Sequence, residues 1–153
     1  MKNWIVKGIA TGLFSGYSPL VPGTVGTIPA WLLLFFVVGT NQIALLAVTA
    51  LFIAVSVWAA GEAERLFGHD AKKIVIDEWA GMAVAVLFVP ISFTNYLIAF
   101  LAFRFFDVVK LPPASQFERL PGGWGVTMDD VAAGVHANIA VQIYLLVVRY
   151  WYS

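Results

Sequence analysis

Residues 126–134 read Val-Thr-Met-Asp-Asp-Val-Ala-Ala-Gly and place two adjacent acids, Asp129 and Asp130, at the start of a long apolar segment. An upstream stretch has a similar arrangement, in which Asp77 and Glu78 precede small residues and another apolar run. Between the two pairs lies a third charged cluster at a hydrophobic boundary, formed by Arg104, Asp107 and Lys110. We predict that the chain folds to bring these three clusters together at one face of a membrane.

The composition favours a membrane protein. Of the 153 residues, 61% are hydrophobic and 12% are charged, and the mean hydropathy is +0.86. About a quarter of the residues in an average soluble domain are charged, so this chain has too few charges to cover a globule that faces water. An unusually apolar soluble helical protein is the alternative. The length fits a single domain, which we predict to comprise residues 1–153.

Charge and cysteine content exclude other classes of protein and site. The formal net charge is zero, and without a basic field the chain is not expected to bind nucleic acid. The sequence contains no cysteine, which excludes disulfides and thiolate metal sites. No cleavable signal peptide is expected, because the apolar run at residues 8–14 is short and lacks an Ala-x-Ala cleavage pattern.

The apolar segments predict an all-α fold, a compact helical bundle that crosses a membrane several times through short spans. Residues 43–60 form the cleanest span, and residues 131–148 form the last. Glycine and proline interrupt residues 15–29, so we expect a loop-rich or re-entrant segment there, whose backbone could form an anion-binding nest. A helix is expected to begin near Ile28, with Thr27 as its N-cap.

The loops between the apolar segments alternate in charge. Residues 40–42 and 90–95 are uncharged, whereas residues 61–78 and 107–130 carry nearly all of the charge. Positive residues mark the cytoplasmic side of a membrane protein, and among those in loops and termini only Arg149 falls on the opposite side. This alternation predicts a multi-pass protein with its N-terminus inside.

The same topology predicts that the clusters meet. Both acid pairs then open outward-going helices on the cytoplasmic side, and the Arg104 cluster closes an inward-going helix there, with its three members on one helix face. Acids in a first helical turn are also favoured by the helix dipole, and Thr127 with Asp130 resembles a capping box, so a structural role is the alternative for one pair. Two pairs and a charged face at one depth favour a functional site.

The residue types in the clusters suit phosphate chemistry. Carboxylates without cysteine favour a hard cation such as Mg²⁺, while arginine and lysine bind phosphate. Together they predict metal-assisted phosphoryl transfer or hydrolysis, and the membrane location assigns the phosphate to a lipid. His69 with Asp70 is a further candidate for a proton carrier or ligand. His136, inside the last apolar segment, is not expected to take part in the chemistry.

Four ordered motifs extend over most of the chain. They are Ser15-Gly16-x-Ser18-Pro19-x-x-Pro22-Gly23-Thr24-x-Gly26, Asp77-Glu78-x-x-Gly81, Phe103-Arg104-x-x-Asp107-x-x-Lys110-x-Pro112 and Gly122-Gly123-x-Gly125-x-x-Met128-Asp129-Asp130-x-x-Ala133-Gly134. In order and spacing, from about residue 8 to 140, the chain resembles the phosphatidylglycerophosphatase A family. It departs from the family pattern at residues 111–113, where the proline after Lys110 is displaced by one position.

The resemblance implies Mg²⁺-dependent hydrolysis of phosphatidylglycerophosphate to phosphatidylglycerol and phosphate, at the bacterial inner membrane with the site facing the cytoplasm. Direct attack by metal-activated water is favoured over an aspartyl-phosphate intermediate. The catalytic acids are expected to be Asp77, Glu78, Asp129 and Asp130, which together with Asp107 would also bind the metal. The residues expected to bind the substrate phosphate are Arg104, Lys110, Ser18 and Thr24.

Two other functions are the alternatives. A small ion-coupled transporter would use the buried acids as a cation site, but it predicts charges spread through the depth of the membrane rather than gathered at one boundary. A phosphotransferase that joins two lipid precursors would present a dense Asp-x-x-Asp-Gly repeat on one helix, and the sequence contains none.

Overall fold

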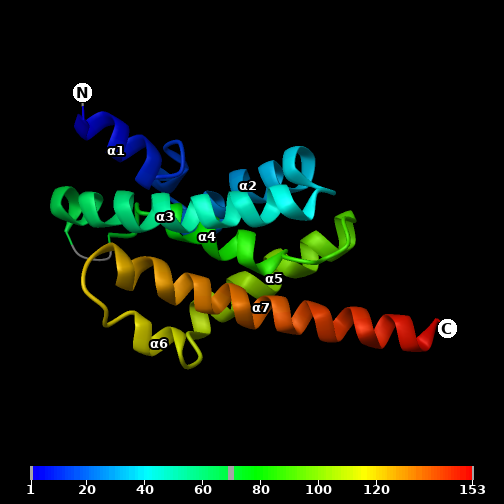
Figure 1. Ribbon diagram of the computed structural model, residues 1–153. Coiled ribbons are helices and arrows are strands. Elements are labelled where there is room, and N and C mark those ends of the chain that lie inside the picture. The colour runs from blue at the N-terminus through cyan, green and yellow to red at the C-terminus, as the bar shows by residue number, and fades with distance from the viewer. Residues whose placement is uncertain (1, 69–70, 153) are drawn as a thin grey trace.

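The computed structural model describes residues 2–68 and 71–152, and every regular element in these two ranges is helical (Figure 1). In chain order the elements are α1 (Lys2–Ala10), the 3-10 helix η1 (Ser15–Tyr17), α2 (Pro22–Leu33), the π-helical turn η2 (Leu34–Val38), α3 (Gln42–Phe67), α4 (Ile76–Ala85), α5 (Phe93–Val109), α6 (Ala114–Phe117) and α7 (Gly123–Trp151). The predicted all-α class is confirmed.

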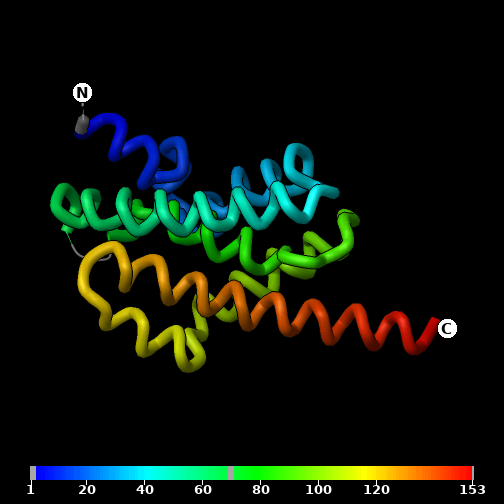
Figure 2. The backbone as a smooth tube through the Cα atoms, viewed as in Figure 1, coloured from blue at the N-terminus to red at the C-terminus, as the bar shows by residue number. Residues whose placement is uncertain are grey.

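The short helix α4 is the centre of the bundle. Every residue from 78 to 85 is buried, because beyond its first turn the helix is apolar on all sides, as is typical of a helix inside a core. It packs mainly against α7 and α3 and also contacts α2 and α5. Figure 2 shows α3 on one side of α4 and α7 on the other.

Two glycines bring α4 and α7 into close contact. A Cβ atom at Gly134 would collide with the backbone carbonyl of Gly81, and a Cβ atom at Gly81 would collide with the Phe103 ring and the backbone carbonyl of Asp130. Only glycine permits two backbones to approach in this way. The contact brings the first turn of α4 beside the second turn of α7, where the two acid pairs lie.

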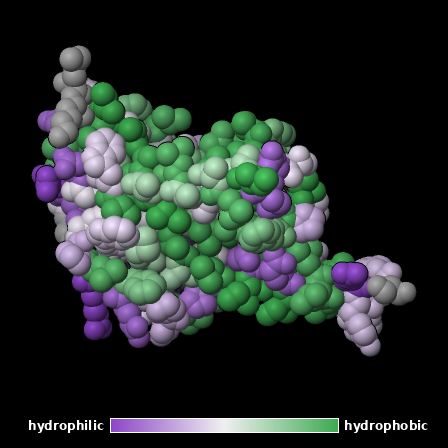
Figure 3. All heavy atoms as spheres, viewed as in Figure 1, coloured by the Kyte–Doolittle hydropathy of each residue, from purple (hydrophilic) through white to green (hydrophobic). Residues whose placement is uncertain are grey.

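Charged and uncharged connections lie at opposite ends of the bundle. Because α3 runs antiparallel to α4 and α7, the connection after α3 and the one before α7 lie at the same end (Figure 1). The connections from η2 to α3 and from α4 to α5 lie at the other end. The space-filling view in Figure 3 shows hydrophilic side chains at the first end and a hydrophobic surface along the middle. The charge alternation in the sequence thus becomes a separation along the bundle.

Within the described ranges, two helices are long and apolar enough to cross a membrane, as judged by length and composition. They are α3 with 26 residues and α7 with 29, and only 33% and 28% of their most apolar windows are buried inside the protein. Exposed side chains on them include Ile43 and Leu51 of α3 and Ile139 and Ile143 of α7. This outward apolar surface is compatible with contact with lipid.

The expectation of a loop throughout residues 15–29 is wrong in its second half. The helix α2 begins at Pro22 rather than near Ile28, and proline is well tolerated in a first helical turn because its missing N–H has no partner to lose. The glycines of this segment serve close packing: Gly26 lies against Val75, and a Cβ atom there would overlap the valine side chain. Glycine therefore marks a helix contact here and not a turn.

The start of α7 also differs from the expectation. The helix begins at Gly123, so that Asp129 and Asp130 lie in its second turn and not at its N-terminus. The capping box that was the structural alternative for Thr127 and Asp130 does not form, because Thr127 is buried inside the helix with its Oγ1 2.7 Å from Ser56 Oγ of α3. Gly123 packs on the α3 backbone, where a Cβ atom would not fit. Asp129 and Asp130 therefore do not act as N-terminal caps of α7.

Candidate active site

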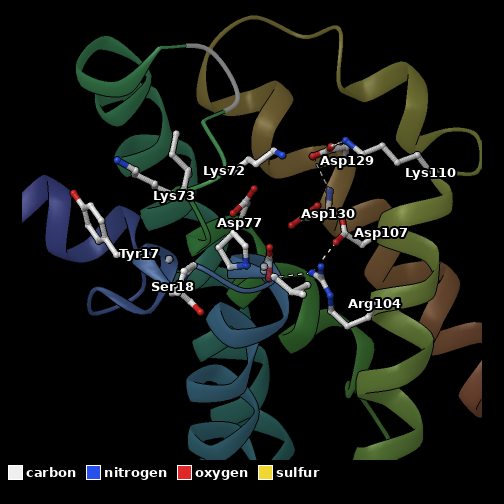
Figure 4. A pocket seen from close by; sticks show the side chains of 17 residues that line it. Tyr17, Ser18, Lys72, Lys73, Asp77, Arg104, Asp107, Lys110, Asp129 and Asp130 are labelled. Atoms are coloured by element: carbon white, nitrogen blue, oxygen red, sulfur yellow. Dashed lines mark hydrogen bonds and ion pairs between the residues drawn. The ribbon is translucent and has the colours of Figure 1, made fainter.

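The three charged clusters line one pocket at the charged end of the bundle, with a volume of about 680 Å³ (Figure 4). Its described wall contains the acids Asp77, Glu78, Asp107, Asp129 and Asp130 and the cations Lys72, Lys73, Arg104 and Lys110. The remaining lining residues come from the segment 16–23 and from Ile74. Clusters that are far apart in the sequence thus converge on a common cavity, as the positions of the charges at the ends of the apolar segments predict.

Arg104 joins two acids from different helices. Its Nη1 lies 3.0 Å from Glu78 Oε2 on α4 and 2.7 Å from Asp107 Oδ2, one turn later on its own helix α5. Thr27 of α2 also donates a hydrogen bond to Glu78 Oε2. Burial raises the pKa of Glu78 to about 7, although Arg104 and Thr27 oppose the rise. The Glu78 carboxyl is therefore only partly ionised near neutral pH. Contacts from α2 and α5 hold it in place.

Lys110 holds an acid of the other pair. It follows α5 in the left-handed region, with φ of 49°, and its ammonium donates to Asp129 Oδ2 and to Glu118 Oε1, both at 2.9 Å. Burial lowers the pKa of Lys110, but the two carboxylates raise this pKa by more than burial lowers it, so the net shift is upward. Asp129 is therefore bound by a permanent cation, as Glu78 is bound by Arg104.

Asp77 and Asp130 differ from their neighbours in the sequence. Asp77 Oδ1 and Asp130 Oδ2 are buried and have no hydrogen-bond partner in the described structure. Burial, together with the negative charges of Glu78 and Asp129, raises the pKa of Asp77 well above its ordinary value. Buried carboxylate oxygens are rarely left unpaired in folded proteins. These two atoms are therefore the pocket oxygens most available to a ligand.

The hydroxyl groups near the pocket are only partly those that the sequence indicates. Ser18 lines the cavity, but Thr24 is not among its described lining residues. Instead Thr27 reaches Glu78, although the sequence pattern indicates an N-cap at this position. The contact of Thr27 could not be anticipated while the segment was expected to be a loop, because only the helical path of α2 aims this side chain at α4.

The pocket wall also contains Lys72, Lys73 and Tyr17, for which the motifs alone indicate no role. The signal that could have found the two lysines is their position, because they stand only a few residues before Asp77. His69 and Asp70, the further candidates, lie outside the described residues.

His136 does not line this pocket. Its ring stacks on Phe106 of α5, with ring centres 5.5 Å apart, and its Nδ1 is buried without a hydrogen-bond partner. His136 therefore belongs to the contact between α5 and α7.

Most acids of the cavity are paired with cations. In the described part of the chain, no three acidic or histidine side chains are arranged as a ready-made metal site. Glu78, Asp107 and Asp129 each bind Arg104 or Lys110. The carboxylate oxygens left for a cation therefore belong above all to Asp77 and Asp130.

The comparison with known proteins identifies the family. Residues 8–145 match the family model described as Phosphatidylglycerophosphatase A. The chain belongs to this family. Within it, the motifs that carry the resemblance in the sequence are those that build the pocket, because they supply both acid pairs, Arg104 and Lys110. The resemblance to phosphatidylglycerophosphatase A is thus confirmed.

Three curated relatives cover most of the chain. It is 35% identical to phosphatidylglycerophosphatase A of Escherichia coli, over 94% of this chain and 83% of the relative. It is 33% identical to phosphatidylglycerophosphatase A of Haemophilus influenzae, over 94% of this chain and 88% of the relative. A Bacteroides thetaiotaomicron protein named for a proposed phosphatidylinositol-3-phosphatase activity is 37% identical, over 88% of this chain and 90% of its own length. No solved structure matches the chain.

Family membership confirms the predicted class of enzyme. The chain is a phosphatase, a hydrolase of phosphoric monoesters. Nothing in the comparisons supports the ion-coupled transporter. The charged connections also lie at one end of the bundle rather than along its length, as expected for a phosphatase with a polar pocket at that end.

Proposed function

We propose that this phosphatase hydrolyses the terminal phosphate monoester of phosphatidylglycerophosphate and releases phosphatidylglycerol and phosphate. The observation that carries the proposal is one pocket in which Asp77 and Asp130 lie beside the cations Arg104 and Lys110. Each of these two acids, here called unpartnered, has one buried carboxylate oxygen without a hydrogen-bond partner in the described structure. A phosphate monoester needs cations for binding and an acid–base group for the attack of water, and this pocket offers both. The names of the Escherichia coli and Haemophilus influenzae relatives support the choice of substrate.

The donor set of the pocket fits Mg²⁺. This cation prefers oxygen ligands, keeps several waters and needs only one or two carboxylates when a substrate phosphate completes its shell. Asp77 and Asp130 would hold it, because each has a buried oxygen without a partner, and Asp107, Asp129 and Glu78 would be the further ligands. Bound there, Mg²⁺ would polarise the phosphoryl group and lower the pKa of a bound water.

The residues of the chain would bind the phosphate and move the protons. Arg104 has donors beyond those that its two carboxylates use, since its Nε is buried without a hydrogen-bond partner. We assign phosphate binding to Arg104 and Lys110, with Ser18 at the pocket wall. The water oxygen attacks phosphorus while the bond from phosphorus to the glycerol oxygen breaks. A pocket carboxylate accepts the proton of the water, and the leaving glycerol oxygen takes up a proton.

We further propose a multi-pass protein of the bacterial inner membrane, with the pocket facing the cytoplasm. The antiparallel helices α3 and α7 would be spans of opposite direction. Exposed tryptophans at both ends of α7, Trp124 at the pocket end and Trp151 at the other, support the assignment, because such side chains favour the two membrane interfaces. The positive residues at the pocket end favour the cytoplasmic side.

The experiment that tests the function is phosphate release from phosphatidylglycerophosphate in detergent micelles, with Mg²⁺ or with EDTA. We expect release by the wild type only with Mg²⁺, and release by Asp130→Asn that is slower by on the order of 10³. The matched control is Arg119→Ala, which removes an exposed cation outside the pocket and should leave the rate unchanged. Equal rates with and without Mg²⁺, or equal rates for the wild type and Asp130→Asn, would overturn the proposal.

The substrate is tested in the same assay with phosphatidylinositol 3-phosphate, which the name of the Bacteroides thetaiotaomicron relative suggests as a competitor. We expect a higher kcat/KM for phosphatidylglycerophosphate. The opposite preference would leave a lipid phosphatase but overturn the assigned substrate.

A further inference from the structure

Lys72 and Lys73 add two positive charges to the wall of the pocket. Both line the cavity from the connection that leads into α4. In the described part of the chain neither lysine makes an ion pair with a carboxylate, whereas Arg104 binds Glu78 and Asp107 and Lys110 binds Asp129 and Glu118. Uncompensated positive charge in a concave site attracts an anion. The two lysines therefore have a greater capacity for an added anion than the cations already paired with acids.

The two lysines lie on the other side of Asp77 from Arg104 (Figure 4). Figure 4 shows the Lys72 ammonium directed toward the α7 side, the Lys73 ammonium directed toward Tyr17, and Asp77 between these lysines and Arg104. Lys73 Nζ lies 5.1 Å from the centre of the Tyr17 ring, a cation–π contact that keeps this charge near the rim. The pocket thus has two basic sides with the unpartnered acid between them.

The segment that carries Tyr17 is apolar at the outer rim of the pocket. Leu20 and Val21 are 75% and 63% exposed, and Val21 also lines the pocket. Large exposed apolar side chains beside a polar cavity suit the acyl part of a lipid or the lipid surface itself. A lipid whose acyl chains lie at this rim places the nearest part of its headgroup beside Lys72 and Lys73.

We propose that Lys72 and Lys73 form a second anion subsite, which binds the phosphodiester of the lipid substrate. This inference rests on the proposed function, because phosphatidylglycerophosphate carries a monoester at the end of its headgroup and a diester next to the acylated glycerol. With the monoester between Asp77 and Arg104, the diester lies toward the rim, where the lysines stand. The subsite thereby selects lipids in which a phosphodiester separates the monoester from the acyl chains.

Inhibition of phosphatidylglycerophosphate hydrolysis by two soluble anions tests the subsite. Glycerophosphoglycerol has the diester but neither monoester nor acyl chains, and inorganic phosphate resembles the group that is released. In Lys72→Ala/Lys73→Ala we expect the inhibition constant of glycerophosphoglycerol to rise about tenfold, as for the loss of two solvent-exposed charged contacts. The constant of inorganic phosphate should change less than twofold. KM for the lipid should rise while kcat stays nearly constant, because a contact equal in ground and transition states is lost.

Two further variants make the result specific. Lys72→Arg/Lys73→Arg keeps both charges and should retain most of the inhibition by glycerophosphoglycerol, and Arg119→Ala should leave both constants unchanged. Each single alanine variant is measured beside the double variant, with thermal unfolding as the check on folding. Absence of glycerophosphoglycerol inhibition in the wild type, an unchanged constant in the double variant, or an equal loss for both anions would overturn the subsite. A wild type that releases no phosphate from the lipid would instead overturn the proposed function.

Discussion

The acid pair that opens α4 and the acid pair in the second turn of α7 look alike in the sequence, but their members have different surroundings. In each pair one acid is bound by a cation: Glu78 by Arg104, and Asp129 by Lys110. The other acid, Asp77 or Asp130, keeps a buried carboxylate oxygen without a partner. Each pair thus contains one acid that fixes a cation at the pocket wall and one that is available to a ligand.

The two pairs also differ in what compensates their charge. Asp77 lies in the first turn of α4, where the free N–H groups and the helix dipole stabilise a negative charge. Asp130 lies inside α7, nearly two turns beyond its start, and is only 4% exposed. Its charge therefore depends more strongly on the ligand in the pocket, and it is the residue at which the division of roles is tested best.

The largest effect is expected from the two unpartnered acids. Asp130→Asn and Asp77→Asn should lower kcat for phosphate release by on the order of 10³, as for the loss of an essential acid–base or metal-binding group. Neither variant should lower the free energy of unfolding without metal, because an amide is cheaper to bury than an unpaired carboxylate. Steady-state kinetics and chemical unfolding of the same preparations measure both quantities.

The partnered acids provide the contrast. Glu78→Gln and Asp129→Asn should lower both kcat and the free energy of unfolding, because each removes one of the two carboxylates that bind a partly buried cation. If all four variants lost stability equally, the distinction between partnered and unpartnered acids would be wrong.

The second effect in size concerns the link between helices. Arg104→Gln leaves Glu78 and Asp107 without their shared cation, and removing one partner of a buried ion pair destabilises by about 3 kcal/mol. We expect a similar loss in the free energy of unfolding and a decrease in kcat/KM of about 10². Arg104→Lys keeps the charge but loses the planar fork, so its losses should be intermediate. An Arg104→Gln protein with wild-type stability would show that the two acids do not need this cation.

The convergence of the clusters could be predicted from the sequence, because charges at the ends of apolar segments must meet where the segments turn. The spacing of Arg104 and Asp107 likewise predicts the helix face that they share. The starts of α2 and α7 could not be predicted, since Gly26 and Gly123 allow either a turn or a close helix contact, and only tertiary packing decides. The cation that binds each acid could not be predicted for the same reason, because it depends on side chains from other segments of the chain.

The third effect joins pH to metal binding. The pKa of Glu78 is raised from 4.5 to about 7 in the folded chain, so the metal-free fold binds this proton more tightly than the unfolded chain does. The stability that the bound proton contributes is complete below pH 4.5 and is lost as the pH rises through 7. Mg²⁺ must displace protons from the acids, so it should stabilise the fold more at pH 8 than at pH 6.

Thermal unfolding with and without Mg²⁺ at the two pH values measures this coupling. At a fixed Mg²⁺ concentration of 100 times the dissociation constant at pH 8, the stabilisation should be about 2.7 kcal/mol at pH 8 and smaller at pH 6. Asp130→Asn should reduce it most, and Arg119→Ala should leave it unchanged. A stabilisation that is equal at both pH values would show that Mg²⁺ does not bind at these carboxyl groups.

The smallest effect separates two hydroxyls that the sequence does not distinguish. Thr27→Val removes the donor to Glu78, and the loss of about 1 kcal/mol that is typical of one hydrogen bond corresponds to about a fivefold decrease in kcat/KM. Thr24→Val, its matched control, changes a residue outside the described pocket wall and should alter kcat/KM less than twofold.

Because Thr27 lowers the pKa of Glu78, the Thr27 variant should also shift the acidic limb of the pH–rate profile to higher pH. A merely structural role would change the rate without moving that limb. The reverse order, with Thr24→Val the weaker enzyme, would return phosphate binding to the residue that the motif alone indicates.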